Sequence, residues 1–159
     1  MAYCIKKITK FDLPKLICVS RILKESGDDM FFKYQLSHWK NSFIKTFLIV
    51  IYTSFRNTLW GCFENQKIVA TFQTRNIEEE LCFSKFAVHP LKAGKGIGSY
   101  CLKEMEQIAI DKDLRYLRCD VYNKNRFAYD FYIKKGFIEA GEIKTLKYTE
   151  ITLKKCVGN

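Results

Sequence analysis

The most informative segment of the chain is Val88-His89-Pro90-Leu91-Lys92-Ala93-Gly94-Lys95-Gly96-Ile97-Gly98-Ser99-Tyr100. An apolar, strand-like run over residues 81–88 is stopped by Pro90, and a helix-like run begins at Ser99. The first backbone N–H groups of a helix have no acceptor within it and carry a partial positive charge. Glycines let an anion come close to the backbone, because no Cβ stands in the way. The stretch therefore predicts a phosphate-binding turn between a strand and a helix.

The spacing of the glycines separates the known phosphate loops. A P-loop needs Gly, four residues and then Gly-Lys-Ser/Thr, and no such run occurs. The dinucleotide pattern G-x-G-x-x-G fails because its third glycine would fall at Ser99. The observed G-x-G-x-G resembles the pyrophosphate loop of the GNAT superfamily of acetyl-CoA-dependent N-acetyltransferases, whose usual form is Gln/Arg-x-x-Gly-x-Gly/Ala. Gly96 and Gly98 match, whereas Ala93 stands at the Gln/Arg position, where Lys92 or Lys95 is expected to compensate.

A second motif supports the resemblance. The stretch Asn125-Arg126-Phe127-Ala128-Tyr129-Asp130-Phe131-Tyr132-Ile133-Lys134-Lys135-Gly136-Phe137 is similar to the superfamily signature Asn-x-x-Ala-x-x-x-Tyr-x-x-x-Gly-Phe at all five named positions. An ordinary amphipathic helix with a C-cap glycine would explain Gly136 but not the two motifs in the right order and separation. A flexible surface turn would likewise explain only the glycine loop.

The amino-acid composition limits which classes of protein this chain can belong to. The 159 residues, 48% of them apolar, predict a single domain, residues 1–159, with a real core. The longest apolar run, residues 47–52, is too short to span a bilayer, so no membrane partner is expected. Seven cysteines without a Cys-x-x-Cys pair, together with only two histidines, predict reduced core thiols, a cytoplasmic location and no metal site.

The net charge of +10 has three interpretations: a solvated lysine-rich surface, steering of an anionic cosubstrate, or binding of a nucleic acid. No nucleic-acid-binding signature accompanies the charge, so a nucleic-acid partner is not expected. The sequence leaves the oligomeric state open, and a homodimer is one of the states it allows.

Hydrophobic periodicity predicts the order of the elements. The N-terminal strand covers residues 3–8, and Asp12 is the expected N-cap of a helix that ends near Gly27. A second helix is expected over residues 29–43, while residues 44–55 fit either a helix or a strand. The remaining predictions are a hairpin (58–63 and 68–74), a strand (81–88), a helix (99–111), a strand (116–122), a helix (125–135) and a closing hairpin (137–143 and 147–153).

The resemblance implies a fold and a cosubstrate. The fold is α/β (α+β), with a mixed, mostly antiparallel sheet of about seven strands flanked by about four helices. The sheet is splayed between the fourth and fifth strands, where acetyl-CoA sits. The N–H groups of Lys95, Gly96, Gly98 and Ser99 would hold the pyrophosphate. The backbone of Phe86 and Val88 would pair with the pantetheine arm, which the side chain of Asn125 would also contact.

The resemblance also implies direct attack of an amine on the thioester, with Tyr132 as the general acid. A phenol has a pKa of about 10, close to that of a thiol leaving group. The alternative role of Tyr132 is a packed core aromatic. Neutralising a lysine-like amine at pH 7 costs roughly 4.6 kcal/mol, so a base is needed. Some relatives carry a glutamate where this chain has Cys82; the base is therefore unassigned, with Glu80 a candidate beside Glu78 and Glu79.

The acceptor cannot be identified from these motifs. The expected substrate is a primary amine of a small molecule. One alternative is a macromolecular acceptor, such as a protein N-terminus, a lysine or an aminoacyl-tRNA. The other alternative, a non-catalytic CoA-binding module, is suggested by Ala93 and Cys82 and opposed by the intact Tyr132.

Overall fold

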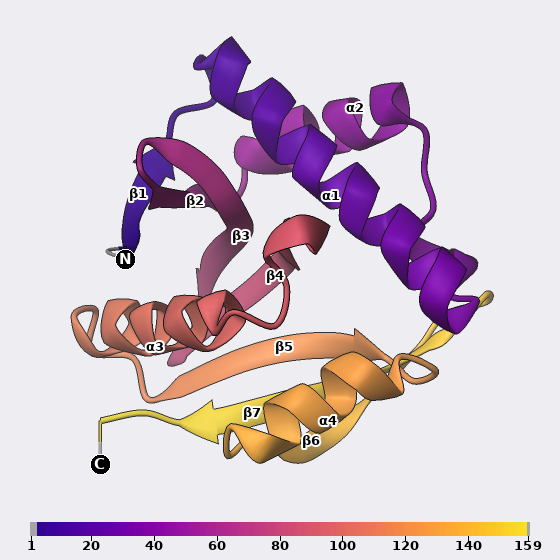
Figure 1. Cartoon of the computed structure of the whole chain (residues 1–159). Helices are drawn as coiled ribbons and strands as arrows, with labels where there is room; N and C mark the ends of the chain where they lie inside the picture. Colours follow the sequence, from indigo (N-terminus) through magenta and orange to yellow (C-terminus); the bar gives the residue numbers. More distant parts are fainter. Residues whose placement is uncertain (1–2, 159) are drawn as a thin grey trace. The chain divides into compact units, whose positions relative to one another are not determined.

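The computed structural model describes residues 3–158, apart from the side chain of His38. The chain forms strands (β), α-helices (α) and short 3₁₀ helices (η), which Figure 1 shows in sequence colours. In chain order they are β1 (Tyr3–Ile8), α1 (Leu13–Tyr34), η1 (Ser37–Trp39), α2 (Phe43–Ser54), β2 (Thr58–Glu64), β3 (Lys67–Ile77), β4 (Glu80–Val88), η2 (Pro90–Lys92), α3 (Ile97–Ile110), β5 (Tyr116–Tyr122), α4 (Arg126–Lys134), β6 (Ile138–Lys144) and β7 (Thr149–Cys156).

The strands belong to one seven-stranded sheet in the order β1-β2-β3-β4-β5-β7-β6. β4 and β5 are parallel, whereas β1–β2, β2–β3, β5–β7 and β6–β7 are antiparallel. The expected mixed sheet with four α-helices is therefore confirmed. The ladder between β4 and β5 joins Glu80–Cys82 to Tyr116–Arg118 and ends there, although β4 continues to Val88. A short ladder is what a sheet that opens between these two strands requires.

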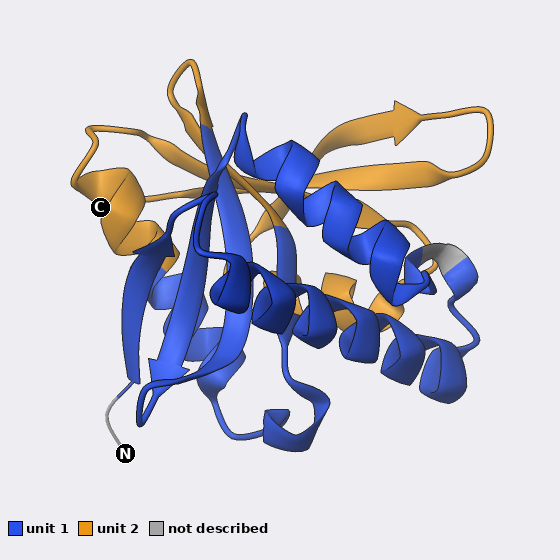
Figure 2. Cartoon of the chain, turned by 90° about the horizontal axis from the view of Figure 1, so that it is seen from above, with its two compact units in different colours: residues 1–75, 85–104 blue, residues 76–84, 105–159 orange. Residues whose placement is uncertain are grey.

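The chain divides into two compact units, coloured separately in Figure 2. Unit 1 holds residues 1–75 and 85–104. Its core joins the inner faces of α1 and α2 to β1, β2, β3 and the end of β4. The buried residues of this core are Ile8, Leu16, Val19, Ile22, Val50, Leu59, Phe63, Ile68 and Ala87.

Unit 2 holds residues 76–84 and 105–159. On β5, the alternation of buried Leu117, Cys119 and Val121 with more exposed residues gives one face to its core. α4 adds Tyr132, and Phe137 follows the helix, so that aromatic rings cover this face of the sheet.

One predicted boundary is wrong. Gly27 does not end the first helix, because α1 runs through it to Tyr34 and stops at Gln35, which takes a left-handed conformation with φ of 56°. Gly27 is buried, and a Cβ there would lie 2.3 Å from the carbonyl oxygen of Trp39. The glycine therefore allows a close approach of two backbone segments instead of marking a stop. The second helix expected over residues 29–43 is absent as a separate element, since residues 29–34 belong to α1 and Ser37–Trp39 form η1.

The ambiguous residues 44–55 are resolved as helix α2, which begins at Phe43. The Ser42 side chain caps it by accepting a hydrogen bond from the N–H of Lys45. Among residues 3–158, no helix has the length and apolar character needed to cross a membrane.

Candidate active site

The glycine-rich turn lies in unit 1 and leads directly into α3. The carbonyl of Gly96 accepts the hydrogen bond of the Tyr100 N–H, which makes Gly96 the residue that precedes the first helical turn. The N–H groups of Ile97, Gly98 and Ser99 then have no acceptor within the helix. These N–H groups and the positive end of the helix dipole form the anion-binding feature that the spacing predicted. Ile97 was missed because the helix was expected to begin at Ser99, whereas α3 begins at Ile97.

Two glycines of the turn are required by backbone conformation. Gly94 and Gly96 have φ of 75° and 79°, in the left-handed region that costs other residues about 1–2 kcal/mol. A Cβ at either position would meet no atom within 4 Å, so the constraint is conformation and not crowding. The turn thus presents bare backbone to its surroundings.

The structure distinguishes the two lysines beside the turn. Lys92 Nζ lies 2.5 Å from the carboxylate of Glu64 at the end of β2. The hydrogen bond from Lys92 lowers the pKa of Glu64, whose side chain is nearly buried. Lys95 is exposed, and no carboxylate of residues 3–158 lies within ion-pair distance of it. Lys95 is therefore the better replacement for the cation that Ala93 cannot supply.

His89 links the end of β4 to α1. Its Nδ1 accepts a hydrogen bond of 3.2 Å from the Leu91 N–H, and its Nε2 lies 3.3 Å from a carboxylate oxygen of Glu25. The backbone N–H of His89 donates to the Val69 carbonyl. These contacts make His89 an anchor for the segment that enters the glycine turn.

Phe86 and Val88 lie at the end of β4, beyond the ladder that this strand forms with β5. Just before them, Lys85 has φ of 50°, a left-handed conformation that is unusual for a non-glycine residue within a strand. The alternating apolar pattern gave no sign of this irregularity. Strained positions of this kind cluster at functional sites.

Tyr132 lies in the aromatic core of unit 2. Its ring centroid is 5.4 Å from that of Phe137 and 5.7 Å from that of Phe83. Burial raises the pKa of the phenol well above its usual value, so the hydroxyl is protonated at neutral pH. The hydroxyl takes part in none of the side-chain hydrogen bonds of residues 3–158, and it is not among their fully buried polar atoms that lack a partner. The ring is thus held by packing, and its proton is not shared with another group of the described chain.

Asn125 caps α4. Its Oδ1 accepts a hydrogen bond of 3.1 Å from the Ala128 N–H, and the residue is buried. The cap uses only the oxygen of the amide, which leaves the two hydrogens of the NH₂ group for another contact. Capping and ligand contact are therefore compatible in this residue.

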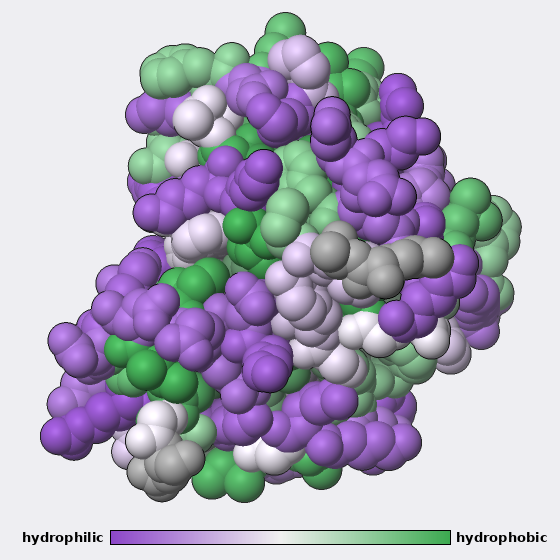
Figure 3. All heavy atoms as spheres, turned by 60° about the vertical axis from the view of Figure 1, so that its left-hand side comes forward, coloured by the Kyte–Doolittle hydropathy of each residue, from purple (hydrophilic) through white to green (hydrophobic). Residues whose placement is uncertain are grey.

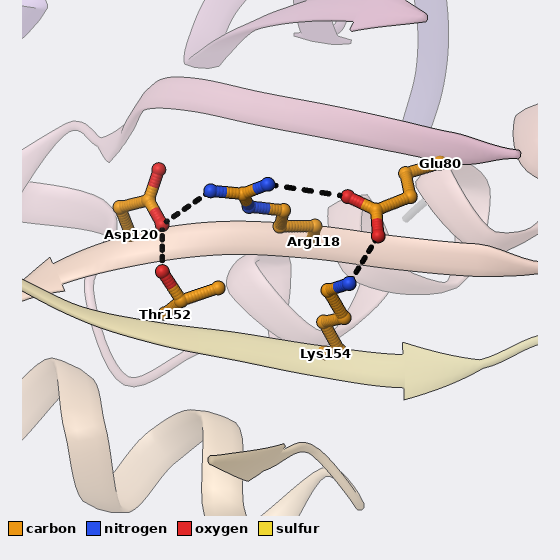
Figure 4. Close-up of polar contacts among 5 residues, drawn as sticks. All are labelled: Glu80, Arg118, Asp120, Thr152 and Lys154. Atoms are coloured by element: carbon orange, nitrogen blue, oxygen red, sulfur yellow. Dashed lines mark hydrogen bonds and ion pairs between the residues drawn. The ribbon is translucent and has the colours of Figure 1, made fainter. Parts of the chain in front are cut away.

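Glu80 takes part in an ion network across three strands of unit 2 (Figure 4). Arg118 on β5 lies between Glu80 and Asp120, at 3.3 and 3.4 Å, and Lys154 on β7 also pairs with Glu80. Thr152 donates a hydrogen bond to Asp120. Burial opposes the ionisation of Glu80, but the hydrogen bonds from Lys154 and Arg118 outweigh it and hold the pKa of the carboxyl below its usual value. A carboxylate so stabilised is a weak proton acceptor.

The other candidate bases have different surroundings. Glu79 is exposed and lies 3.5 Å from Arg115. Glu78 sits in the turn before β4 with φ of 51°. Cys82 is half-buried and stands opposite Arg118 in the ladder. Among residues 3–158, no three His, Cys, Asp or Glu side chains are grouped to hold a metal ion.

Known acetyltransferases share the sequence pattern and the fold of this chain. A sequence model described as the acetyltransferase (GNAT) family matches residues 23–137. The fold resembles that of PaiA N-acetyltransferase from Thermoplasma acidophilum, solved with coenzyme A, at 19% identity and a TM-score of 0.75, covering 98% of this chain and 99% of that one. It also resembles ribosomal-protein-S18-alanine N-acetyltransferase from Escherichia coli, at 18% identity and a TM-score of 0.68, covering 98% and 93%. No curated protein matches the chain in sequence. At these identities the solved structures establish the likeness of fold.

Proposed function

This chain belongs to the acetyltransferase (GNAT) family, and from that premise we propose that it transfers an acetyl group from acetyl-CoA to a primary amine of a small molecule. In this proposal residues 1–159 act as one catalytic domain. The observation that carries the proposal is the turn before α3, which combines free backbone N–H groups, two left-handed glycines and Lys95, a cation without an ion-pair partner among residues 3–158.

The fit to acetyl-CoA rests on the chemistry of these donors. A pyrophosphate needs several donors at close range, and the N–H groups of Lys95, Gly96, Ile97, Gly98 and Ser99 are such a set. The backbone of Phe86 and Val88 is assigned to the pantetheine arm, and the NH₂ group of Asn125 is assigned to the same arm. Acetyl-CoA supplies the activated acetyl group.

Tyr132 is assigned as the general acid that protonates the departing thiolate. Its buried, protonated phenol and its uncommitted hydroxyl support this role. Burial raises the pKa of the phenol and so makes it a weaker acid than a free phenol, which counts against rapid proton transfer; the role rests on the match to the motif and on the uncommitted hydroxyl. The ion pairs of Glu80 argue against it as the base, so the base is left unassigned.

A second candidate keeps the reaction and changes the acceptor to a macromolecule, such as a protein N-terminus. The net charge of +10, which would attract an anionic partner, favours it. Seven free cysteines favour a reducing compartment, so the cytoplasm is the proposed location in either case.

The first test is the thermal midpoint of the protein with and without saturating acetyl-CoA, with NADH and ATP as controls. A ligand at 100 times its dissociation constant adds about 2.7 kcal/mol and shifts the midpoint by several degrees. A shift with acetyl-CoA alone supports the proposal. An equal shift with ATP would reduce the turn to a general anion site, and no shift would remove the proposal.

The second test is acetyl transfer to a panel of small amines and to short peptides, followed by mass spectrometry of the products. Detection by mass avoids thiol reagents, which would react with the exposed Cys4 and Cys156. Acetylated amines support the proposed acceptor class, and acetylated peptides alone support the macromolecular one. CoA binding without any transfer would identify a non-catalytic module.

A further inference from the structure

The outer face of α2 is apolar. Its large side chains, spaced by three or four residues, share one face of the helix and are mostly exposed. These residues, the outer α2 stripe, are Ile44 (70% exposed), Leu48 (59%), Tyr52 (61%) and Phe55 (62%), the last at the C-cap. The adjoining face packs against the core of unit 1 through Phe47, Val50 and Ile51. A surface helix normally turns polar residues outward, so α2 is unusual in being apolar on both faces.

Cations lie directly on this stripe. The Nζ of Lys10 is 4.5 Å from the ring centroid of Phe55 and 5.4 Å from that of Phe11, which is itself 81% exposed. The guanidinium of Arg56 is 5.3 Å from the ring centroid of Tyr52. Phe11 and Lys10 therefore extend the stripe beyond the end of α2, with positive charges over its aromatic rings.

The positive charge of the protein is concentrated on unit 1. This unit holds 16 of the 27 Lys and Arg residues but only 6 of the 17 Asp and Glu residues, whereas unit 2 holds 11 of each. The entire net charge of +10 thus falls on unit 1. Figure 3 shows one face of the chain, on which hydrophilic residues surround separate apolar groups.

Carboxylates do not neutralise the cations near α2. Residues 30–63 contain no Asp or Glu. The carboxylates of residues 3–75 each contact a Lys or His side chain elsewhere; these are Asp12, Glu25, Asp28, Asp29 and Glu64. In the described residues 3–158, no carboxylate lies within ion-pair distance of Lys10, Lys45 or Arg56.

A large apolar patch rimmed by charge marks a contact with a protein or a membrane. A second copy of this chain would bring the same positive charge to the patch and be repelled. Protein–protein interfaces are enriched in aromatic residues and Arg but depleted in Lys, so Lys10 and the charge of unit 1 distinguish the two kinds of partner; Lys and Arg beside Phe, Leu and Ile on a helix are typical of segments that lie in the interface of an anionic bilayer. A nucleic acid presents mainly charged phosphates, so binding it would not bury the exposed aliphatic side chains of the stripe.

We propose that the outer α2 stripe, with Phe11, Lys10 and Arg56, docks unit 1 onto the surface of an anionic lipid bilayer. The helix lies in the plane of the headgroups, with its apolar side chains inserted and its cations against the lipid phosphates. This proposal departs from the expectation of no membrane partner, which rested on the lack of an apolar run long enough to span a bilayer; a surface contact needs no such run.

The test is co-sedimentation of the full chain with vesicles of phosphatidylcholine alone or mixed with phosphatidylglycerol. Binding is expected only to the mixed vesicles, and salt should weaken it because the phosphate contacts are screened. Leu48→Gln should weaken binding about tenfold, since one inserted apolar side chain is lost. Lys10→Gln should reduce binding to mixed vesicles and lower its salt dependence.

Leu146→Gln is the matched control, because Leu146 is fully exposed between β6 and β7 in the electrically neutral unit 2. It should bind mixed vesicles like the original chain. Circular dichroism should show that Leu48→Gln and Leu146→Gln remain folded. Failure to bind mixed vesicles overturns the proposal, as does equal binding by the Leu48 variant. A dimer in light scattering that Leu48→Gln dissociates would overturn it in favour of a second copy.

Discussion

At the scale of the residue, Tyr132 combines packing and chemistry in separate atoms. Its ring is fixed by Phe83, Phe131 and Phe137, while its hydroxyl takes part in none of the side-chain hydrogen bonds of residues 3–158. Removing the hydroxyl therefore leaves the ring in place. This separation makes the proposed acid role testable without disturbing the fold.

Tyr132→Phe is expected to lower kcat by about 100-fold, because a general acid contributes roughly 10²–10⁴ in rate. The dissociation constant of acetyl-CoA and the thermal midpoint should stay unchanged, since the ring contacts remain. Steady-state kinetics with calorimetric binding measures both quantities. Full turnover by the variant would assign Tyr132 to packing alone.

Asn125 offers a similar separation of roles. Asn125→Asp keeps an oxygen that can cap α4 but replaces the NH₂ donors by an acceptor. It should retain the stability of the original chain and weaken acetyl-CoA binding. Asn125→Ala should lose both, with stability falling by about 1 kcal/mol for the missing cap. If Asn125→Asp binds acetyl-CoA normally, the residue serves only as a cap.

At the scale of the element, the turn at residues 94–96 and the first turn of α3 act as one anion-binding feature. Its donors are backbone groups, so their direction depends on the conformation of Gly94 and Gly96 and on the start of the helix. Of the two lysines beside the turn, only Lys95 is left to contact a bound anion with its side chain, because Lys92 is paired with Glu64. Substitutions that alter φ should therefore matter more than those that alter polarity.

Gly96→Ala is expected to cost about 1–2 kcal/mol of stability and to weaken acetyl-CoA binding, because alanine disfavours the left-handed conformation. Gly98→Ala should be tolerated, since this position lies in the helix, where alanine is the better helix former by about 1 kcal/mol. Thermal melts and acetyl-CoA titrations of both variants test this contrast. Equal losses in both variants would contradict it.

Gly27 shows why the end of a helix can be predicted wrongly from the sequence. A glycine after a helical pattern is a common stop signal, and Gly27 has the same local context. Its actual function is to let the Trp39 carbonyl come close to α1, a contact with a residue twelve positions away. No local pattern distinguishes a glycine that ends a helix from one that makes room beside it.

At the scale of the whole molecule, charge is unevenly divided. Unit 1 carries the net charge, while unit 2 balances its charges and uses several of them in the network around Arg118. The Nε of Arg118 is buried and has no hydrogen-bond partner in the described chain. The network thus depends on the two carboxylates that face the guanidinium, Glu80 and Asp120.

Glu80→Gln is expected to lower the free energy of unfolding at neutral pH by about 1–3 kcal/mol, because Lys154 and Arg118 lose a charged partner. The folded-state pKa of Glu80 is lowered, so its contribution is present above the unfolded-state pKa and is lost as the pH falls through the folded-state value. Denaturant unfolding should therefore show the difference at pH 7 and its disappearance in acid, below the usual glutamate pKa of about 4.3.

Glu79→Gln is the control for this change, because its exposed pair with Arg115 is worth at most about 1 kcal/mol. A difference between Glu80→Gln and the original chain that persists unchanged in acid would contradict the pH argument. A loss of activity in Glu80→Gln without a loss of stability would favour Glu80 as the base.

The sequence alone predicted the family and the order of the elements outside residues 29–55, because both depend on local patterns. Within residues 29–55 the expected helix over 29–43 was wrong and residues 44–55 stayed ambiguous. The strands at residues 3–8 and 116–122 agree with the structure at both ends, and the motifs around Gly96 and Tyr132 rest on fixed spacings along the chain. Local spacing is sufficient where neighbours in sequence are also neighbours in space, as in a strand, a helix or a turn.

The contacts between side chains distant in sequence became visible only in the folded chain. The tertiary structure assigned Lys92 to Glu64, His89 to Glu25, and Glu80 to Arg118 and Lys154, and it turned the apolar residues of α2 both inward and outward. The physical reason is that pairing and burial depend on which residues the folded chain brings together. A periodic pattern predicts which residues share a face of a helix, but it does not predict which face the rest of the protein buries.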